Sequence, residues 1–339
     1  MAIVHMRPDD GPKAWRGADL GEEGPWLLSV TATEQKEITA ALDHAKCSGV
    51  PMLHWQEQDF PLETMHLKLA GMAHEIRDGL GFAILRGLDI GAWTDEEVGM
   101  VYWGLGVHLG EPLGQNPKGD LLGHVYDQKR PYGQLDVRGY ETNAYLPYHT
   151  DSCDFLGLMC LRQGLSGGLS SVVSSVSVHN AILEQHPEYL GLLYNGFYYI
   201  RREEALGSKG FSEVPIPVFG QHDGVISCRY LRNQINAAAA KRGVPLTTIE
   251  QEALDFLDEQ TQREDLRLDF MLEPGDMEFC NNYTVLHSRT SFTNGPDLHQ
   301  QRHMLRLWLK FRGEWPVSEH FPSHQGYVLK ERGMALADP

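Results

Sequence analysis

With 339 residues, the chain is long enough for one large domain or two ordinary ones and can bury a sizeable core. Asp and Glu number 46 against 29 Lys and Arg, and the resulting formal charge of -17 would repel a phosphate backbone, so nucleic acid is not expected as a partner. The composition, 42% hydrophobic and 22% charged, is typical of a soluble globular protein. No run is apolar for long enough to span a bilayer and the N-terminal residues do not resemble a secretion signal, so we expect a cytoplasmic protein without membrane contact.

The cysteines and the absence of repeats limit the kinds of site and the number of domains that we expect. The five cysteines are scattered without any Cys-x-x-Cys pair, which argues against a disulfide framework and against a zinc-thiolate site. The sequence contains no internal repeat, low-complexity tract or Pro/Ser-rich linker. We therefore expect a single domain over residues 1–339, with added elements, rather than two domains.

The first part of the chain predicts helices around one short strand. Thr31–Lys46 begins with hydroxyl residues and carries apolar residues at helical spacing, and Pro61–Gly81 is a second amphipathic helix that ends in glycines. Phe82–Leu88 is a candidate buried strand, and a helix is expected from about Asp95 to Leu105. Residues 1–80 are thus expected to form a helical N-terminal elaboration.

From about Gly123 the pattern changes to short β-rich segments separated by Gly, Pro and Asn turns. Strands are expected within Phe155–Leu161, Leu169–Val176, Gly196–Arg202, Gly224–Tyr230, Asp269–Asn282 and Arg302–Phe311. Helical insertions are expected near 177–194 and 247–264. Because strands and helices do not alternate regularly, a doubly wound sheet is not favoured. The pattern predicts a mainly β fold with flanking helices, a β-barrel or jelly roll.

The stretch LPYHTDSCDF, Leu146 to Phe155, places two metal-capable side chains in a strand-like run. Residues i and i+2 of a strand point to the same face, so His149 and Asp151 would project together into a barrel interior or toward its mouth. An imidazole and a carboxylate at this spacing are two adjacent ligands for a divalent metal, and a facial triad needs one more histidine. The alternative is a hydrogen-bonded pair at a strand end.

A third ligand and two cations follow much later in the chain. The segment EPGDMEFCNNYTVLHSR has a turn between two strand-like runs and then leads into His287, which we expect at the opposite edge of a barrel. Arg302 and Arg306 lie four residues apart, on the same face of the last expected strand. Arginine donates bidentately and suits the clamping of a carboxylate near a metal, and in so apolar a run it needs a partner.

With these segments in place, the chain resembles the taurine dioxygenase and clavaminate synthase-like family of Fe(II), 2-oxoglutarate-dependent dioxygenases. The matching segments are YHTD around His149 and Asp151, GGLSSVVSS from Gly167 to Ser175, LEPGDMEFCNNYTVLHSR with His287, and RHMLRLWL with Arg302 and Arg306. They span about residues 80 to 312, in the order and spacing of the family.

The resemblance implies roles for individual residues and a fold. His149, Asp151 and His287 would hold Fe(II). Arg302 would pair with the distal carboxylate of 2-oxoglutarate, helped by the hydroxyl of Ser170, where family members often have threonine. Arg306 would contact either an anionic group of the substrate or the cosubstrate. The family fold is a double-stranded β-helix, a jelly roll, in agreement with the strand pattern.

The resemblance also implies a reaction. Oxidative decarboxylation of 2-oxoglutarate by O2, giving succinate and CO2, would be coupled to oxidation of a C–H bond in a small molecule. An arginine and polar side chains near the expected metal suggest that this molecule is polar and carboxylate-bearing. Position 151 is an aspartate and not a small residue, so the site for a halide ligand is absent and hydroxylation is the expected outcome. Desaturation, ring formation and C–heteroatom cleavage stay open, since the substrate pose would decide among them.

Further substrate contacts are predicted from position alone. Asn143 and Tyr145 are expected on the strand that enters the metal site, in phase with His149, and are equally compatible with turn or core roles. Asn282 lies in the corner before His287, where asparagine most often serves the turn itself. Two other functions stay open, a non-catalytic or isomerase-type metal-binding jelly-roll protein and an oxygenase that acts on a peptide. The two helical insertions are candidates for covering the barrel or for a homo-oligomer interface.

Overall fold

The structure is a computed structural model that describes residues 3–21, 23–116, 118–131, 137–200, 210–318, 321, 327–330 and 333–336. Within them, the helices are α1 (Ala32–Cys47), α2 (Met65–Arg77), α3 (Asp95–Leu109), α4 (Ser175–Gln185), α5 (Pro187–Asn195), α6 (Arg232–Arg242) and α7 (Thr248–Gln262). The strands are β1 (Leu27–Ser29), β2 (Phe82–Arg86), β3 (Glu111–Leu113), β4 (Leu122–Tyr126), β5 (Leu146–His149), β6 (Phe155–Arg162), β7 (Ser166–Gly167), β8 (Ser170–Ser174), β9 (Phe219–His222), β10 (Val225–Cys228), β11 (Arg267–Phe270), β12 (Met277–Asn281), β13 (Val285–Arg289), β14 (Phe292–Thr293), β15 (His303–Lys310), β16 (Tyr327–Lys330) and β17 (Gly333–Leu336).

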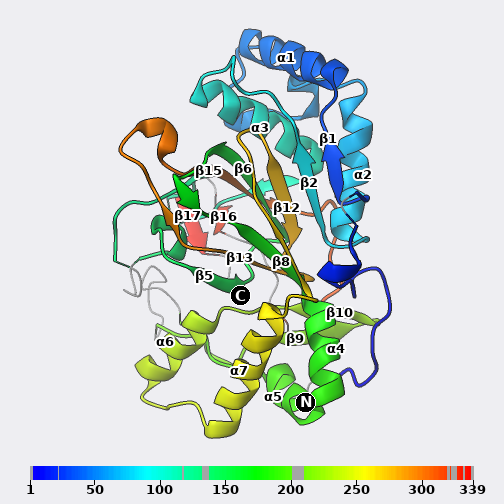
Figure 1. Ribbon diagram of the computed structural model, residues 1–339, viewed down its shortest axis with the longest axis vertical. Coiled ribbons are helices and arrows are strands. Elements are labelled where there is room, and N and C mark those ends of the chain that lie inside the picture. Colours follow the sequence, from blue (N-terminus) through cyan, green and yellow to red (C-terminus); the bar gives the residue numbers. More distant parts are fainter. Residues whose placement is uncertain are drawn as a thin grey trace.

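Two sheets form the centre of the molecule. The larger has seven strands in the order β1-β2-β12-β6-β15-β3, with β4 also paired to β15, and the smaller has the order β11-β8-β13-β5. In Figure 1, α1, α2 and α3 lie at one end of these sheets, and α4 to α7 lie at the other. The described chain is therefore a mixed structure of sheets and helices, and the helices are as prominent as the strands. The expected combination of β-sheets with flanking helices is confirmed, and the helices that cover both sheets are more extensive than a mainly β fold implies.

Three apolar clusters hold these layers together. One lies between the two sheets, with members on β2, β6, β12 and β15 of the larger sheet and on β8 and β13 of the smaller. A second fills the space between α1 to α3 and the outer face of the larger sheet. The third packs α4, α5 and α7 against the outer face of the smaller sheet. Each sheet is thus buried on both faces, which explains why its strands read as nearly continuous apolar runs.

Strand β15 shows how the alternation of side chains along a strand places a charged side chain between the sheets. Met304 and Trp308 belong to the inter-sheet cluster, whereas Leu305, Leu307 and Leu309 belong to the cluster beneath the helices. Because side chains alternate along a strand, Arg306 points between the sheets together with Met304 and Trp308. It is only 6% exposed.

Several elements differ from the sequence-based expectations. The insertion near 177–194 is two helices, divided between His186 and Pro187, where proline begins α5. The expected strand Gly196–Arg202 was wrong in its described part, since residues 197 and 200 make only isolated bridges; residues 201 and 202 lie outside the described residues. Gly196, at φ +81°, turns the chain sharply after α5. Helix α6 was not predicted, since its alanine-rich sequence has no clear apolar periodicity.

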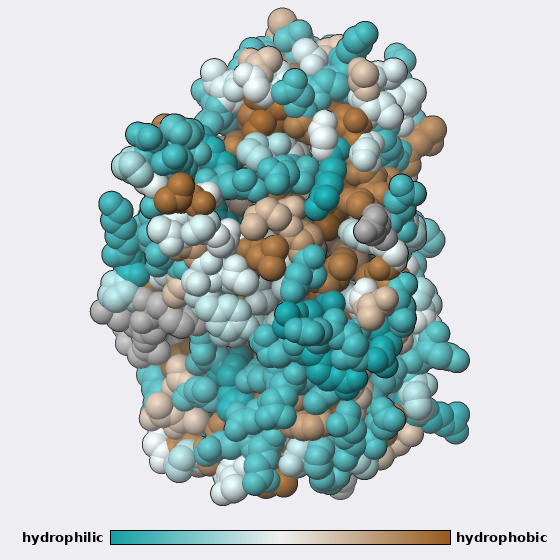
Figure 2. All heavy atoms as spheres, in the orientation of Figure 1, coloured by the Kyte–Doolittle hydropathy of each residue, from teal (hydrophilic) through white to brown (hydrophobic). Residues whose placement is uncertain are grey.

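The hydropathy of the surface differs between the two ends of the molecule. On the face shown in Figure 2, apolar side chains gather around α2, α3, β1 and β2, whereas the region over α7 is mostly hydrophilic. Helix α7 buries Ala253, Leu254, Leu257, Gln260 and Thr261. Among the described residues, no helix has the length and apolar character that a membrane crossing requires.

The N-terminus of α3 offers a test of local stability. The Thr94 side chain accepts from the Glu97 backbone N–H at 3.2 Å, and the Glu97 carboxylate accepts from the Thr94 backbone N–H at 2.9 Å. Thr94→Ala removes half of this capping box and is expected to lower the free energy of unfolding by about 1 kcal/mol. Thr94→Ser should keep most of that stability; equal loss in both variants, measured by denaturant unfolding, would contradict the assignment.

Candidate metal centre

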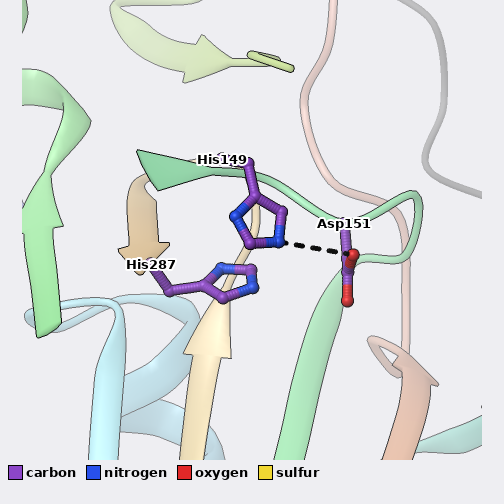
Figure 3. A group of neighbouring side chains, drawn as sticks. All are labelled: His149, Asp151 and His287. Carbon is purple, nitrogen blue, oxygen red and sulfur yellow. Dashed lines mark ion pairs between the residues drawn. The ribbon is translucent and has the colours of Figure 1, made fainter. Parts of the chain in front are cut away.

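The structure brings His149, Asp151 and His287 together between the two sheets. His149 is the last residue of β5, Asp151 follows in the next turn, and His287 lies in the middle of β13, directly opposite His149 in the strand pair. One potential ligand atom from each lies within 4.8 Å of the others. Figure 3 shows the two imidazole rings facing each other with the Asp151 carboxylate beside them. The two histidines stand on adjacent strands, and not at opposite edges as expected from their separation in sequence.

Hydrogen bonds leave a suitable ligand atom on each side chain. His149 donates from Nδ1 to the Pro147 carbonyl at 2.8 Å, which leaves Nε2, 4.0 Å from Asp151 Oδ1, with a free lone pair. Asp151 Oδ2 accepts from the indole N–H of Trp308 at 2.9 Å, so Oδ1 is available. His287 Nδ1 is buried and has no hydrogen-bond partner in the described part of the chain. Two imidazoles and one carboxylate are the donor set of non-haem Fe(II) sites, so the residues present fit such an ion.

The electrostatics favour the protonation states that metal binding requires. Burial lowers the pKa of His287 to about 3, aided by the neighbouring His149, and burial also lowers the pKa of His149. Burial alone would raise the pKa of Asp151, but Arg306, the two histidines and the Trp308 N–H outweigh it and lower that pKa. Neutral imidazoles beside an ionised carboxylate are therefore the resting state.

Arg306 lies directly beside the metal-binding carboxylate. Its Nη1 is 3.5 Å from Asp151 Oδ2, and its Nε donates to Gln115 Oε1 at 2.8 Å. Gln115 in turn donates to the carbonyls of Arg306 and Leu121. The guanidinium also lies over the Tyr140 ring, 4.4 Å from its centroid. Arg306 is thus held in place by protein groups on several sides, and its closest acidic neighbour is a proposed ligand.

Asn282 holds the turn that carries Asp151. Its Oδ1 accepts from the Asp151 backbone N–H at 2.8 Å, and its Nδ2 donates to Cys153 Sγ at 3.2 Å. The side chain is fully buried. Both ends of the amide are therefore used to hold the turn that carries Asp151, which fits a positioning role better than the predicted substrate contact.

The other two predicted substrate residues lie before β5 and not on it. Asn143 is exposed, and its carbonyl accepts from the Phe292 backbone N–H. Tyr145 is 40% exposed, and its hydroxyl accepts from Gln262 of α7 at 2.7 Å. Since α7 packs outside the smaller sheet, this bond holds the Tyr145 hydroxyl toward the helix layer and away from the triad.

Arg302 is a buried cation without an anionic partner among the described residues. It is 6% exposed, its Nη1 has no hydrogen-bond partner among the described residues, and burial lowers its pKa to about 10. Gly168, at φ +78°, lies so close that an added Cβ would be 2.9 Å from Arg302 Nε. A small pocket beside Arg302 is lined by Cys160, Gln163, Gly164, Gly167, Gly168, Met271, Leu272, Arg302 and Met304. A buried unpaired guanidinium at a pocket is suited to bind an anion.

Ser170 occupies the neighbouring strand β8. It pairs with Arg289 of β13 and Phe270 of β11 and is 4% exposed. Val172, two residues later, belongs to the inter-sheet cluster, so the Ser170 side chain also points between the sheets. Its hydroxyl lies against the carboxyl of Glu278 on β12.

Trp308 is a residue whose role the sequence did not indicate, since we would expect a tryptophan in an apolar strand to be core packing. Trp308→Phe retains an aromatic, smaller ring but removes the donor to Asp151, and it is expected to weaken divalent metal binding about 10- to 100-fold. Trp103→Phe is the matched control, because the Trp103 indole is also buried but its N–H has no partner in the described residues. Equal metal affinities of the two variants in a calorimetric titration would contradict the role of Trp308.

Comparisons with known proteins agree with this geometry. Residues 48–308 match the family model described as taurine catabolism dioxygenase TauD, TfdA family. FR-33289 synthase of Streptomyces rubellomurinus is 32% identical over 330 residues, covering 94% of this chain and 95% of the relative. The taurine hydroxylase-like protein SAT17 of Stachybotrys chartarum is 27% identical over 308 residues, covering 87% of this chain and 77% of its own length.

Solved structures show the same fold at lower sequence identity. Asparagine oxygenase, in complex with Fe(II), a hydroxyasparagine and succinate, superimposes with a TM-score of 0.65 at 18% identity, covering 84% of this chain and 94% of that one. The non-haem iron oxygenase OrfP, with Fe and α-ketoglutaric acid, gives 0.62 at 17% identity, with coverages of 84% and 94%. The chain therefore belongs to the taurine catabolism dioxygenase TauD, TfdA family, the iron- and 2-oxoglutarate-dependent dioxygenases that its motifs resemble.

Proposed function

We propose that this protein hydroxylates a small polar, carboxylate-bearing molecule, with Fe(II) held by His149, Asp151 and His287 and with 2-oxoglutarate and O2 as cosubstrates. The observation that carries the proposal is a largely buried two-histidine, one-carboxylate cluster between two sheets. Arg302, a buried arginine whose Nη1 has no partner among the described residues, lies directly before β15, the strand that carries Arg306. A metal-binding protein without turnover would have no need for such an arginine.

The protein residues have distinct tasks in this proposal. His149 presents Nε2 because its Nδ1 is fixed on the Pro147 carbonyl, and Asp151 presents Oδ1 because Trp308 occupies Oδ2. Three protein ligands of this kind would leave room on the metal for 2-oxoglutarate and O2. When bound, Fe(II) supplies the redox chemistry of O2 activation, while the chain supplies orientation and excludes water.

Arg302 is the proposed partner of the distal carboxylate of 2-oxoglutarate. Its guanidinium lacks an anion, and a charge-assisted pair with a carboxylate would satisfy Nη1. Gly168 allows the arginine to lie close to the β7–β8 turn, and Ser170 faces the same interior. We assign Arg306 to the region beside the metal ligands, where its guanidinium stabilises the ionised Asp151. Its remaining N–H groups are available to a substrate anion.

The substrate class is inferred from relatives and from the charge of the site. The asparagine oxygenase and OrfP structures contain hydroxylated amino acids, and the Streptomyces relative is named as a synthase. A small polar substrate that places an anionic group near Arg306 agrees with the amino acids in these structures and with the positive charge of the site. Because Asn282 is used internally and Tyr145 is held by α7, these two become positioning residues in the proposal, and Asn143 stays a candidate contact.

The proposal extends to the fold, the domain organisation, the cellular location and the oligomer surfaces. The two facing sheets are assigned as a double-stranded β-helix, a jelly roll, within one oxygenase domain over 1–339 that carries a helical elaboration in 1–80 and insertions at α4–α5 and α7. A cytoplasmic location is proposed, and the helical insertions are the candidate surfaces for a homo-oligomer.

The test is an activity screen with two readouts. The Fe(II)-loaded protein is incubated with O2, 2-oxoglutarate and one member of a panel of small polar molecules, with and without carboxylates, and succinate and oxidised product are quantified. We expect a carboxylate-bearing member to raise succinate formation and to gain one oxygen atom. An active member that has no anionic group would contradict the proposed substrate class, and product formation without 2-oxoglutarate would contradict the reaction.

A further inference from the structure

Glu278 is a buried acid that the proposed mechanism does not use. It is the second residue of β12, where Met277 and Phe279 pack under the helices and Cys280 belongs to the inter-sheet cluster. Because side chains alternate, the Glu278 carboxyl points between the sheets with Cys280. It is 2% exposed. A carboxyl in that position needs a partner or a proton.

Its surroundings supply little that would hold a negative charge. Glu278 Oε1 accepts from the Cys280 thiol at 3.4 Å, and Oε2 has no hydrogen-bond partner in the described residues. On the flanking strands, Ile84 and Leu158 stand opposite Glu278. Across the interior, the Ser170 hydroxyl lies nearby.

The one cation that acts on Glu278 is Arg302, yet the two form no ion pair among the described residues. Each therefore keeps an unsatisfied buried atom, Oε2 on the acid and Nη1 on the arginine. The other titratable groups near this pair are the thiols of Cys160 and Cys280 and the hydroxyl of Tyr102 on α3, all uncharged at neutral pH. Arg302 Nη1 can donate a hydrogen bond, and so can the Glu278 carboxyl when it is protonated. A third group with acceptor atoms, such as a carboxylate, would satisfy both.

We propose that Glu278 is a further cosubstrate-binding residue: in its protonated form it donates a hydrogen bond to the distal carboxylate of 2-oxoglutarate, beside Arg302 and Ser170. An ionised Glu278 would instead place a second negative charge next to that carboxylate and compete with it for Arg302. The proton on Glu278 thus decides how tightly the cosubstrate binds. This inference rests on the proposed function of the site.

The charge balance supports this assignment. Burial raises the pKa of Glu278 to about 7, against Cys280, Ser170 and Arg302, which favour the ionised form. Below that pH the side chain is protonated in the free protein, and cosubstrate affinity is at its full value. Above it, binding must take up a proton, so the Kd for 2-oxoglutarate should rise about tenfold with each pH unit.

The experiment compares wild type with Glu278→Gln, which keeps a donor but cannot ionise. Anaerobic calorimetry at saturating Fe(II), from about pH 6 to about pH 8.5, gives the Kd for 2-oxoglutarate, and Fe(II) binding is measured separately at each pH. We expect wild-type affinity to fall above about pH 7 and that of Glu278→Gln to stay constant. Glu273→Gln, at an exposed position just before β12, should titrate like wild type.

A second measurement uses wild type alone, in case the variant does not fold. Titration at about pH 8 in two buffers of different ionisation enthalpy gives the protons taken up with 2-oxoglutarate, and about one is expected. Zero uptake, or a Glu278→Gln variant with the same pH dependence as wild type, would overturn the role of Glu278 while leaving the proposed function intact. Absence of 2-oxoglutarate binding at every pH would overturn both.

Discussion

Asp151→Ala is expected to lose Fe(II) affinity by at least about 100-fold and to show no measurable 2-oxoglutarate turnover. The substitution removes one of three ligands and also leaves Arg306 and the Trp308 N–H without their shared acceptor. An uncompensated buried guanidinium also costs stability, so the free energy of unfolding should fall as well. Metal affinity is measured by anaerobic calorimetry and turnover by succinate formation.

The control for this variant is Asp43→Ala, an exposed aspartate of α1. It should bind metal and turn over like wild type. Circular dichroism of Asp151→Ala at a temperature well below its unfolding midpoint separates loss of the ligand from loss of the fold. A folded Asp151→Ala protein with wild-type Fe(II) affinity would remove Asp151 from the ligand set.

Arg302→Met is expected to keep Fe(II) binding and to raise the Kd for 2-oxoglutarate about 30-fold or more. Removing one partner of a buried charge pair costs at least about 2 kcal/mol, and methionine retains much of the apolar volume of arginine. Because free Arg302 has no anionic partner in the part of the chain that the structure describes, its loss relieves a burial cost in the free protein, and stability should change little. The affinity follows from a titration of the Fe(II)-loaded variant with 2-oxoglutarate.

Arg267→Gln provides the comparison, because Arg267 pairs with Asp269 at the start of β11, in the smaller sheet, and is not among the residues that line the pocket beside Arg302. Its 2-oxoglutarate affinity should match that of wild type. If Arg302→Met also matched wild type, the distal carboxylate would have to bind elsewhere, and the assignment of the pocket would be wrong.

The sequence indicated the grouping of His149, Asp151 and His287 that the structure shows, while their role as metal ligands stays a prediction. His149 and Asp151 are close in sequence, so strand periodicity alone brings them together, and His287 and the two arginines follow in strongly patterned strands. Asn282 was singled out for its proximity to His287, but its two hydrogen bonds depend on a turn 131 residues away.

The residues that support the site could not be found in the same way. Gln115 and Trp308 act through partners that are distant in sequence, and each resembles an ordinary loop or core residue when read locally. Glu278 is different, because a single acid in an apolar strand is a visible signal of function. Its meaning depends on Arg302 and Ser170, which only the folded chain places nearby.

The fold errors have local physical causes. The apolar and aromatic residues after Gly196 favour a strand by propensity, but in the structure they pack on α4, α5 and β9 with only isolated bridges. Helix α6 has high intrinsic propensity from its alanines without an apolar stripe, so periodicity misses it. Tertiary packing decides both segments.

The most direct test of the central claim is an anaerobic titration of the metal-free wild-type protein with Fe(II) and then 2-oxoglutarate, followed by visible absorption. Chelation of a site-bound Fe(II) by the keto oxygen and adjacent carboxylate of 2-oxoglutarate should produce a weak charge-transfer band that saturates at one equivalent of each. Tight Fe(II) binding without any such band would contradict the account and would identify the protein as a metal-binding fold that does not use 2-oxoglutarate.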